Sequence, residues 1–444
     1  MAKKNYSLLL FILCSPFVAF SQTNVDTTIK TVTLRQCVDF ALKNQPAVKQ
    51  AAIDETINER NINISLAAWL PQVTGSGLYN YYFKGSPIVP SASSNTSTGR
   101  IDNLSTLGLQ ASQVIYNNDV LQAAKAAKYS RLYYKQNTTS SQINVVADVS
   151  KAFFDVLLSQ KQLDILNEDI VRLQRSLKDA HSQYNAGVVD KTDYKQATIA
   201  LNNSLASRKQ TEEAIKSKVA YLKQIMGLGA ESNLTLSYDS AKFETEAIAD
   251  TNQRLDYNNR IEYQLLQTQK NLQNVNVNYY KWGFLPSLSA NGVYNLNYFS
   301  ESFSTLYNKS FPNAYVGLSL SLPIFQGNKR LQNLSKARLE VDRADLDITN
   351  AKNTISTEYV QALASYKSNY TNWQFLKENV SLAKDVYHVV SLQYREGIKI
   401  YLDVIIAQSD LRTAELNYYN SLFQVLSSKI DLQKALGILS VQQN

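Results

Sequence analysis

Apolar and polar residues alternate one by one in four stretches of the chain and follow a helical spacing almost everywhere else. A period of two is typical of β-strands with one apolar face. The alternating stretches pair up across polar loops, which predicts two β-hairpins, at about 72–116 and about 287–323. Pro323 ends the last strand of the second hairpin.

Helical spacing predicts long helices on both sides of each hairpin. Thr33 and Gln36 form a capping box at the start of a first helix, which Pro46 is expected to kink and Leu70-Pro71 to end. At ~1.5 Å per residue the two longest helices would each extend roughly 100 Å. Apolar residues such as Leu166, Ile170 and Leu173 step by three and four, which is the spacing of nearly parallel, coiled-coil-like packing. The expected ranges are 33–69, about 118–185, 190–226, 328–395 and 400–436.

The same pattern occurs twice in the chain. Equivalent residues recur 210 positions apart, and Trp69-Leu70-Pro71 returns as Phe284-Leu285-Pro286 at a shift of 215. A repeat of this length indicates a duplicated half-molecule rather than a short solenoid unit. The pairs at 210 are Tyr184 and Tyr394, Gly187 and Gly397, Asp193 and Asp403, Ala197 and Ala407, Leu201 and Leu411, and Gly227 and Gly437.

The hairpins favour a membrane-spanning sheet. Four strands of ~10 residues with one apolar and one small polar face are typical of a transmembrane β-barrel, and such barrels need at least ~8 strands to close. Three chains would supply twelve strands around a polar lumen. Tyrosine and phenylalanine near the strand ends fit an interfacial aromatic girdle. The alternative is two small antiparallel hairpins on an ordinary soluble helical bundle.

The N-terminus has the form of a secretory signal. Lys3 and Lys4 precede the apolar stretch from Leu8 to Phe20, which is too short to cross a membrane. Small residues around Ser21 predict a mature chain that begins at Gln22. The alternative is a lipoprotein signal in which Cys14 carries the lipid, although bulky Leu13 precedes that cysteine. No later stretch is predicted to be a transmembrane helix.

Composition excludes several classes of function. The net charge is +8, or +6 without Lys3 and Lys4, and the basic residues are scattered, so nucleic-acid binding is not expected. His181 and His388 have no neighbours at metal-ligand spacing, and nucleotide and nucleophile motifs are missing from the sequence. Cys37 is interpreted as a packed small residue. We therefore expect no enzyme, no cofactor and no metal, but a function set by geometry and electrostatics.

The order helix, hairpin, long helix, glycine turn and helix, twice over, resembles the TolC-like outer-membrane efflux proteins. The most specific motif is YREGIKIYLDVIIAQSDL around Gly397, together with Leu-Pro opening each hairpin. The resemblance implies a mainly α protein with a small β part. It also implies a homotrimer whose twelve-stranded β-barrel lies in outer-membrane lipid and continues into a long α-helical barrel across the periplasm. The implied partners are a periplasmic adaptor protein and an inner-membrane transporter.

The resemblance also places a gate at the periplasmic tips. Gly187 and Gly397 would form the turns on which the adaptor docks, since glycine ends a helix in the reversed conformation without strain. By position, Asp193, Tyr394 and Lys399 would link the tips, and Asp403 would contribute to a ring of carboxylates at the entrance. Lys399 stands where the best-known member of the family has arginine, and a lysine ammonium cannot make the paired hydrogen bonds of an arginine guanidinium. A second acid expected at Ile406 is missing. A simpler interpretation is that both acids stabilise helix starts.

The expected organisation is a signal peptide at 1–21, a first repeat at 22–228, a connecting belt segment at 229–250 and a second repeat at 251–444. The expected function is an outer-membrane channel-tunnel of a tripartite efflux or type I secretion system, which conducts substrates passively to the exterior. The alternative is a periplasmic or surface coiled-coil scaffold without a pore.

Overall fold

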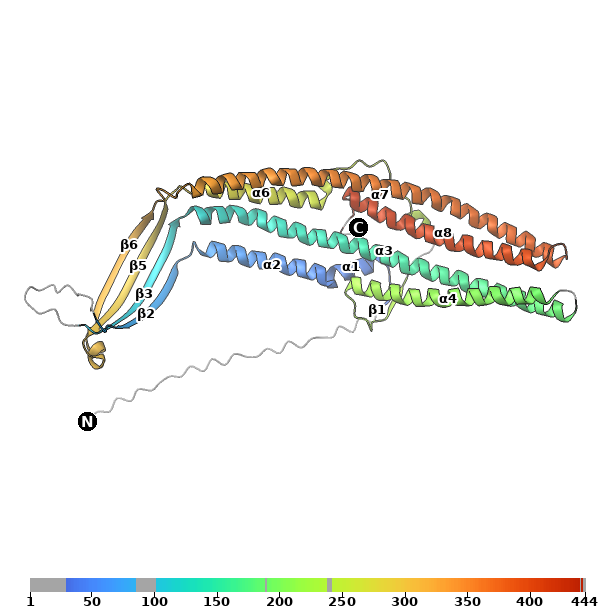
Figure 1. The fold of residues 1–444 in the computed structure, drawn as a ribbon, viewed down its shortest axis with the longest axis horizontal. Coiled ribbons are helices and arrows are strands. Elements are labelled where there is room, and N and C mark those ends of the chain that lie inside the picture. The colour runs from blue at the N-terminus through green and yellow to red at the C-terminus, as the bar shows by residue number, and fades with distance from the viewer. Residues whose placement is uncertain (1–28, 85–100, 188–189, 238–241, 440, 442–444) are drawn as a thin grey trace, which may run out of the picture.

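The computed structural model describes residues 29–84, 101–187, 190–237, 242–439 and 441. A four-stranded sheet forms one end of an elongated molecule, and two helical hairpins form the other end (Figure 1). The signal peptide, Cys14 and most of the first hairpin loop lie outside the described residues. The helices are α1 Leu34–Asn44, α2 Pro46–Ala67, α3 Asn118–Asn185, α4 Lys191–Met226, α5 Lys242–Glu246, α6 Ile261–Lys281, α7 Lys329–Arg395 and α8 Tyr401–Leu436. The strands are β1 Ile29–Val32, β2 Gln72–Tyr81, β3 Asn103–Tyr116, β4 Leu234–Leu236, β5 Ser287–Ser300 and β6 Phe311–Ser321.

The two predicted hairpins join into one antiparallel sheet in the order β2-β3-β5-β6. One row of paired residues runs through Val73, Ala111, Gly292 and Val316, so the apolar positions of all four strands share one face. None of the four strands contains an acidic, basic or histidine residue. Strand β6 begins earlier than the alternation predicted and includes Pro312. A proline is tolerated there because Pro312 is only the second residue of the strand, at the end of the ladder.

The two halves have the same construction. Helices α3 and α7 have 68 and 67 residues, and α4 and α8 each have 36 residues with bounds offset by 210. In each half a short helix and the last helix lie end to end along the long one: α2 then α4 along α3, and α6 then α8 along α7 (Figure 1). Apolar residues at three–four spacing face these contacts, and Leu166, Ile170 and Leu173 are buried.

The first predicted helix is in fact two helices. Thr33 and Gln36 form the expected capping box. Pro46, however, does not kink a continuous helix: Gln45 takes an extended conformation and Pro46 starts α2. Proline is well suited to the first position of a helix because its missing N–H would have no partner there. Strand β1, which pairs in parallel with β4, was not predicted.

The main apolar core lies at mid-length, where α1, α3, α4, α5 and α8 meet. Phe153, Leu158 and Leu422 are almost fully buried in it, together with Phe243 of α5. Cys37 is also buried there, and burial raises the pKa of its thiol to about 12. Polar bonds hold α5 in place: the Lys377 ammonium and the Tyr418 hydroxyl both donate to the Glu244 carboxylate and lower its pKa.

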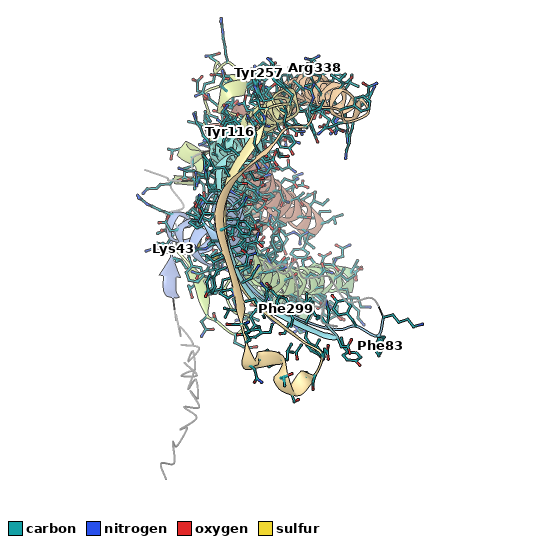
Figure 2. The ribbon with its side chains drawn as sticks, turned by 90° about the vertical axis from the view of Figure 1, so that its left-hand side faces the viewer. Lys43, Phe83, Tyr116, Tyr257, Phe299 and Arg338 are labelled. Atoms are coloured by element: carbon teal, nitrogen blue, oxygen red, sulfur yellow. The ribbon has the colours of Figure 1, made fainter. Side chains whose placement is uncertain are left out.

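Seen along the long axis, the elements lie on an open arc rather than around a closed core (Figure 2). Arg338 of α7 stands at one end of this arc and Phe83 beyond β2 toward the other. Within the described residues, no helix is sufficiently long and apolar to span a bilayer. Many large apolar side chains remain exposed on α7, α2 and the sheet.

Candidate functional site: the helical tips

Each helical hairpin turns on a glycine. Gly187 and Gly397 adopt φ angles of +73° and +75°, the left-handed region that glycine enters without steric cost. A Cβ at either position would meet no atom within 4 Å. Within the described residues, both glycines therefore have open space around them, at the far end of the molecule from the sheet (Figure 1).

Tyr394 connects the two hairpins at the tips. Its hydroxyl donates to Gln183 Oε1 at 2.7 Å, so the last turn of α7 is bound to the last turn of α3. Its ring lies 5.6 Å from that of Tyr401, the first residue of α8. Burial, followed by the negative charges of Asp193 and Asp179, raises the Tyr394 pKa. The hydroxyl is therefore a neutral donor at physiological pH.

Lys399 and Asp403 form a pair on the same turn, with 3.5 Å between Lys399 Nζ and Asp403 Oδ2. Among the residues that the structure describes, no ion pair joins Asp193 to Lys399, and the Tyr394 hydroxyl bonds Gln183 rather than Asp193. Asp193 and Asp403 both lie in the first turn of their helices, where a negative charge is favourable. The N-cap residues themselves are Asp190 and Ile400.

An apolar cluster lies directly behind the turns. Ala180, Ala197 and Tyr401 are buried there, with Leu177 and Tyr194 packed against them. Burial raises the Tyr401 pKa to about 12. Tyr394 thus packs against this cluster and Asp193 is close enough for its charge to act on the Tyr394 hydroxyl, whereas the Lys399–Asp403 pair is half-exposed.

The tips offer no catalytic arrangement within the described part of the chain. His181 contacts Asn185 through Nδ1 at 3.2 Å and packs against Tyr194, which agrees with a role in helix packing. Among the described residues, no three histidine, cysteine, aspartate or glutamate side chains lie together as metal ligands would. The site consists of turns, aromatic rings and a few charges, which suits contact and closure rather than chemistry.

Sequence reasoning missed Gln183 because no family motif marked it. Its counterpart at a shift of 210 is Gln393, and nothing in the repeat distinguishes the two. The buried polar residues Asp169, Ser204 and Gln408 were missed as well. The sequence does mark Asp169. It lies three residues after Leu166 and next to Ile170, so the three–four spacing places this acidic residue beside the apolar seam, close to the core.

Comparison with known proteins decides the family. The sequence pattern of the family described as "Outer membrane efflux protein" matches residues 38–228 and 257–438, which is most of the chain and one segment in each half. The chain belongs to the outer membrane efflux protein family. Channels of this family form trimers in efflux systems.

Curated relatives match over almost their full length. The outer membrane protein TolC of Vibrio cholerae is 20% identical over 434 residues, which cover 96% of this chain and 95% of that protein. The probable efflux pump outer membrane protein TtgC of Pseudomonas putida is 23% identical over 420 residues, covering 91% and 82%. The likeness therefore extends over the whole two-repeat design.

Solved structures show the same fold. The CusC channel protein aligns with a TM-score of 0.74 at 17% identity, covering 93% of this chain and 92% of that one. The CmeC outer membrane channel of Campylobacter jejuni aligns with a TM-score of 0.71 at 19% identity, covering 93% and 87%. This member of the efflux family is thus a non-enzymatic outer-membrane channel protein with a long helical part.

Proposed function

We propose that three copies of the chain close into a twelve-stranded barrel and a helical tunnel that conduct cargo out of the cell. The observation that carries this proposal is the sheet, whose outer strands β2 and β6 each have one unpaired edge. Unpaired strand edges are not stable in lipid, where every backbone polar group must be bonded. Joining β6 of one copy to β2 of the next satisfies both edges and repeats until the ring closes.

The helices support the same arrangement. Apolar side chains recur along α7 at intervals of about seven or a multiple of it and are at least half exposed: Leu339, Leu346, Val360, Phe375, Leu382 and Val389. On α2, at the opposite side of the molecule, Ile53, Ile57 and Ile64 are also exposed. Exposed apolar rows of this length mark protein–protein interfaces. In a head-to-tail trimer, the α7 row of one copy would pack against the α2 row of the next copy, so both rows would be covered.

The chain supplies the conduit, and the energy comes from partners. We place a periplasmic adaptor on the free turns at Gly187 and Gly397, and an inner-membrane transporter behind it. Both glycines are exposed and have open space around them, which suits docking. The outer membrane sustains no ion gradient, and the sequence contains no nucleotide-binding motif.

We place the gate at the same tips. Tyr394 bound to Gln183 ties α7 to α3, and Lys399 with Asp403 fixes the start of α8, while Asp193 adds negative charge next to Tyr394. Repeated by threefold symmetry, these contacts would hold the inner ends of the helices together. The Asp403 carboxylates would then surround the entrance.

Cross-linking tests the assembly directly. A cysteine at Val316 of β6 is paired in turn with cysteines along the outer face of β2, starting at Val73, and treated with a short thiol cross-linker. We expect covalent trimers and, in planar bilayers, single-channel currents. Cysteine at Leu109 of the central strand β3 is the control, because no neighbouring copy should reach it. Monomers that remain water-soluble and carry no current would instead support the coiled-coil scaffold.

A further inference from the structure

A buried polar cluster joins the two halves of the chain partway up the helical hairpins. Asp169 of α3, Ser204 of α4 and Gln408 of α8 are at most 2% exposed. Asp169 lies 18 residues before the turn at Gly187, which is ~27 Å along an α-helix. Three helices from two different hairpins therefore meet at one carboxylate.

The carboxylate of Asp169 is bonded on both oxygens. Gln408 Nε2 donates to Oδ1 at 2.9 Å, and the Ser204 hydroxyl donates to Oδ2 at 2.8 Å. Arg412 Nη1 donates to Ser204 Oγ at 2.7 Å and stands 3.6 Å from Asp169 Oδ2. Arg172 Nη2 lies 3.7 Å from Oδ1. The second repeat thus contributes Gln408 and Arg412 to a polar cluster whose carboxylate, Asp169, belongs to the first repeat.

Apolar packing between the hairpins is incomplete at this level. A cavity of about 280 Å³ separates α4 from α8, and Asp169, Gln408 and Arg412 line it together with Ile199, Leu402 and Ile405. Gln408 Oε1 is buried without a hydrogen-bond partner among the described residues. Beside this gap, the bond from Arg412 to Ser204 joins α8 to α4.

Higher along the same seam, α3 and α8 are bonded again. Gln162 Nε2 donates to Asn420 Oδ1 at 2.6 Å, and Lys151 pairs with Asp431. Beyond those contacts lies the large mid-length core. Asp169–Gln408 therefore joins α3 to α8 between the mid-length core and the apolar cluster behind the turns.

A buried ionic cluster is rarely the most stabilising choice for a core position, since apolar residues of similar volume often do as well or better. Its directional bonds instead specify one alignment of the helices. We propose that Asp169, with Ser204, Gln408 and Arg412, is a positioning cluster that fixes α8 to the first hairpin and holds the gate closed from above. The inference rests on the proposed channel function and adds residues that none of the tip contacts includes.

The decisive variant is Gln408→Leu, which keeps the side-chain volume and removes the bond from α8 to Asp169. We expect the open probability of single channels to rise by at least roughly a hundredfold, because one bond to a charged group is lost in each of three subunits that open in concert. A cysteine pair at positions 169 and 408, joined by a short thiol cross-linker, should restore wild-type currents. Cys37 is fully buried and should not react.

The matched control is Lys218→Met. Lys218 Nζ donates to Asp155 and to Ser159, each at 2.8 Å, so it ties α4 to α3 within one hairpin and does not reach α8. We expect wild-type conductance and an unchanged thermal transition of the trimer in this variant. If Gln408→Leu prevents assembly, Ser204→Ala removes the α4 contribution in its place and should give the same increase.

Three results would overturn the inference. The first is that Gln408→Leu and Ser204→Ala trimers have the same open probability as the wild type. The second is that Lys218→Met raises the open probability as much as they do, which would indicate a general loosening of the helices. Cross-linked channels that stay leaky would also contradict it. If instead neither the wild type nor a variant that combines Tyr394→Phe with Lys399→Ser conducts, the proposed channel function fails and the inference with it. If the wild type conducts and Gln408→Leu gates in the same way, the inference is rejected while the proposed channel function stands.

Discussion

At the scale of single residues, the second-half turn is bonded more strongly than the first. Tyr394 donates to Gln183 across the hairpins, whereas its first-half equivalent, Tyr184, packs on Tyr194 at 5.2 Å between ring centroids and is partly exposed. The repeat therefore keeps the side chain and changes its partner. Duplicated sequences reach different roles in this way, because each copy faces a different neighbour.

Removing the tip bonds should open the channel. We expect Tyr394→Phe combined with Lys399→Ser to raise single-channel conductance and to sensitise cells to large antibiotics. Each exposed link is worth at most ~1 kcal/mol. Three copies that open in concert shift the open population by roughly a hundredfold. Tyr184→Phe is the control and should leave both measurements unchanged. Equal effects of Tyr184→Phe and the double variant would show that the gate is not at Tyr394.

The acid at the start of α8 should bind cations. We expect Asp403→Ala to weaken block by multivalent cations added from the periplasmic side, because a ring of carboxylates concentrates cations at a pore entrance. The blocking concentration, measured in bilayers, should rise. Asp410→Ala, about two turns further along α8, serves as the comparison. A blocking concentration that moves equally in both variants would argue against a ring at Asp403.

At the scale of helices and strands, the glycines that end α4 and α8 do more than relieve strain. Gly227 and Gly437 have φ angles of +70° and +72°, and an added Cβ would lie 2.6 Å from the Asn44 carbonyl oxygen and 2.5 Å from that of Asn259. The end of α4 is thus in close contact with the backbone just before α2, and the end of α8 with the backbone just before α6. This contact sets the end-to-end join within each half.

Alanine at such a join should be more harmful than alanine at a tip. Gly397→Ala costs about 1–2 kcal/mol of unfolding free energy, from the left-handed conformation alone. Gly437→Ala adds a steric clash with backbone, typically a further ~1–3 kcal/mol. We expect a clearly lower thermal transition for Gly437→Ala than for Gly397→Ala in detergent. Equal transitions would mean that the Asn259 contact relaxes freely.

The sequence determined most elements because their signals are local. Helical spacing and a lack of proline predicted α3 and α7 to within a residue or two, and alternation found all four strands of the sheet. Pro46 was misjudged because proline both breaks and starts helices, and only the extended Gln45 decides between them. Spacing could have placed Asp169 near the core, but strand β1 and the bonds of Asp169 to Ser204 and Gln408 depend on contacts between distant segments, which spacing along the chain does not reveal.

At the scale of the whole molecule, the sheet and the turns lie at opposite ends, so orientation in the membrane can be tested. We expect a cysteine at Ser304, between β5 and β6, to react with a membrane-impermeant thiol reagent on intact cells. Outer loops of such barrels face the exterior. A cysteine at Lys191, beside the first turn, should react only after the outer membrane is permeabilised. The opposite pattern would mean that the chain is inserted the other way round.

The lack of charged side chains in the four strands has a consequence for selectivity. A barrel wall built from serine, threonine, asparagine and glutamine hydrates a passing molecule without preferring either sign of charge. The barrel section should therefore rectify weakly and discriminate by size alone. Selectivity between cations and anions would arise in the helical section, close to where Asp193 and Asp403 lie. Ion preference and pore width are then separate properties of one molecule, and each can change without altering the other.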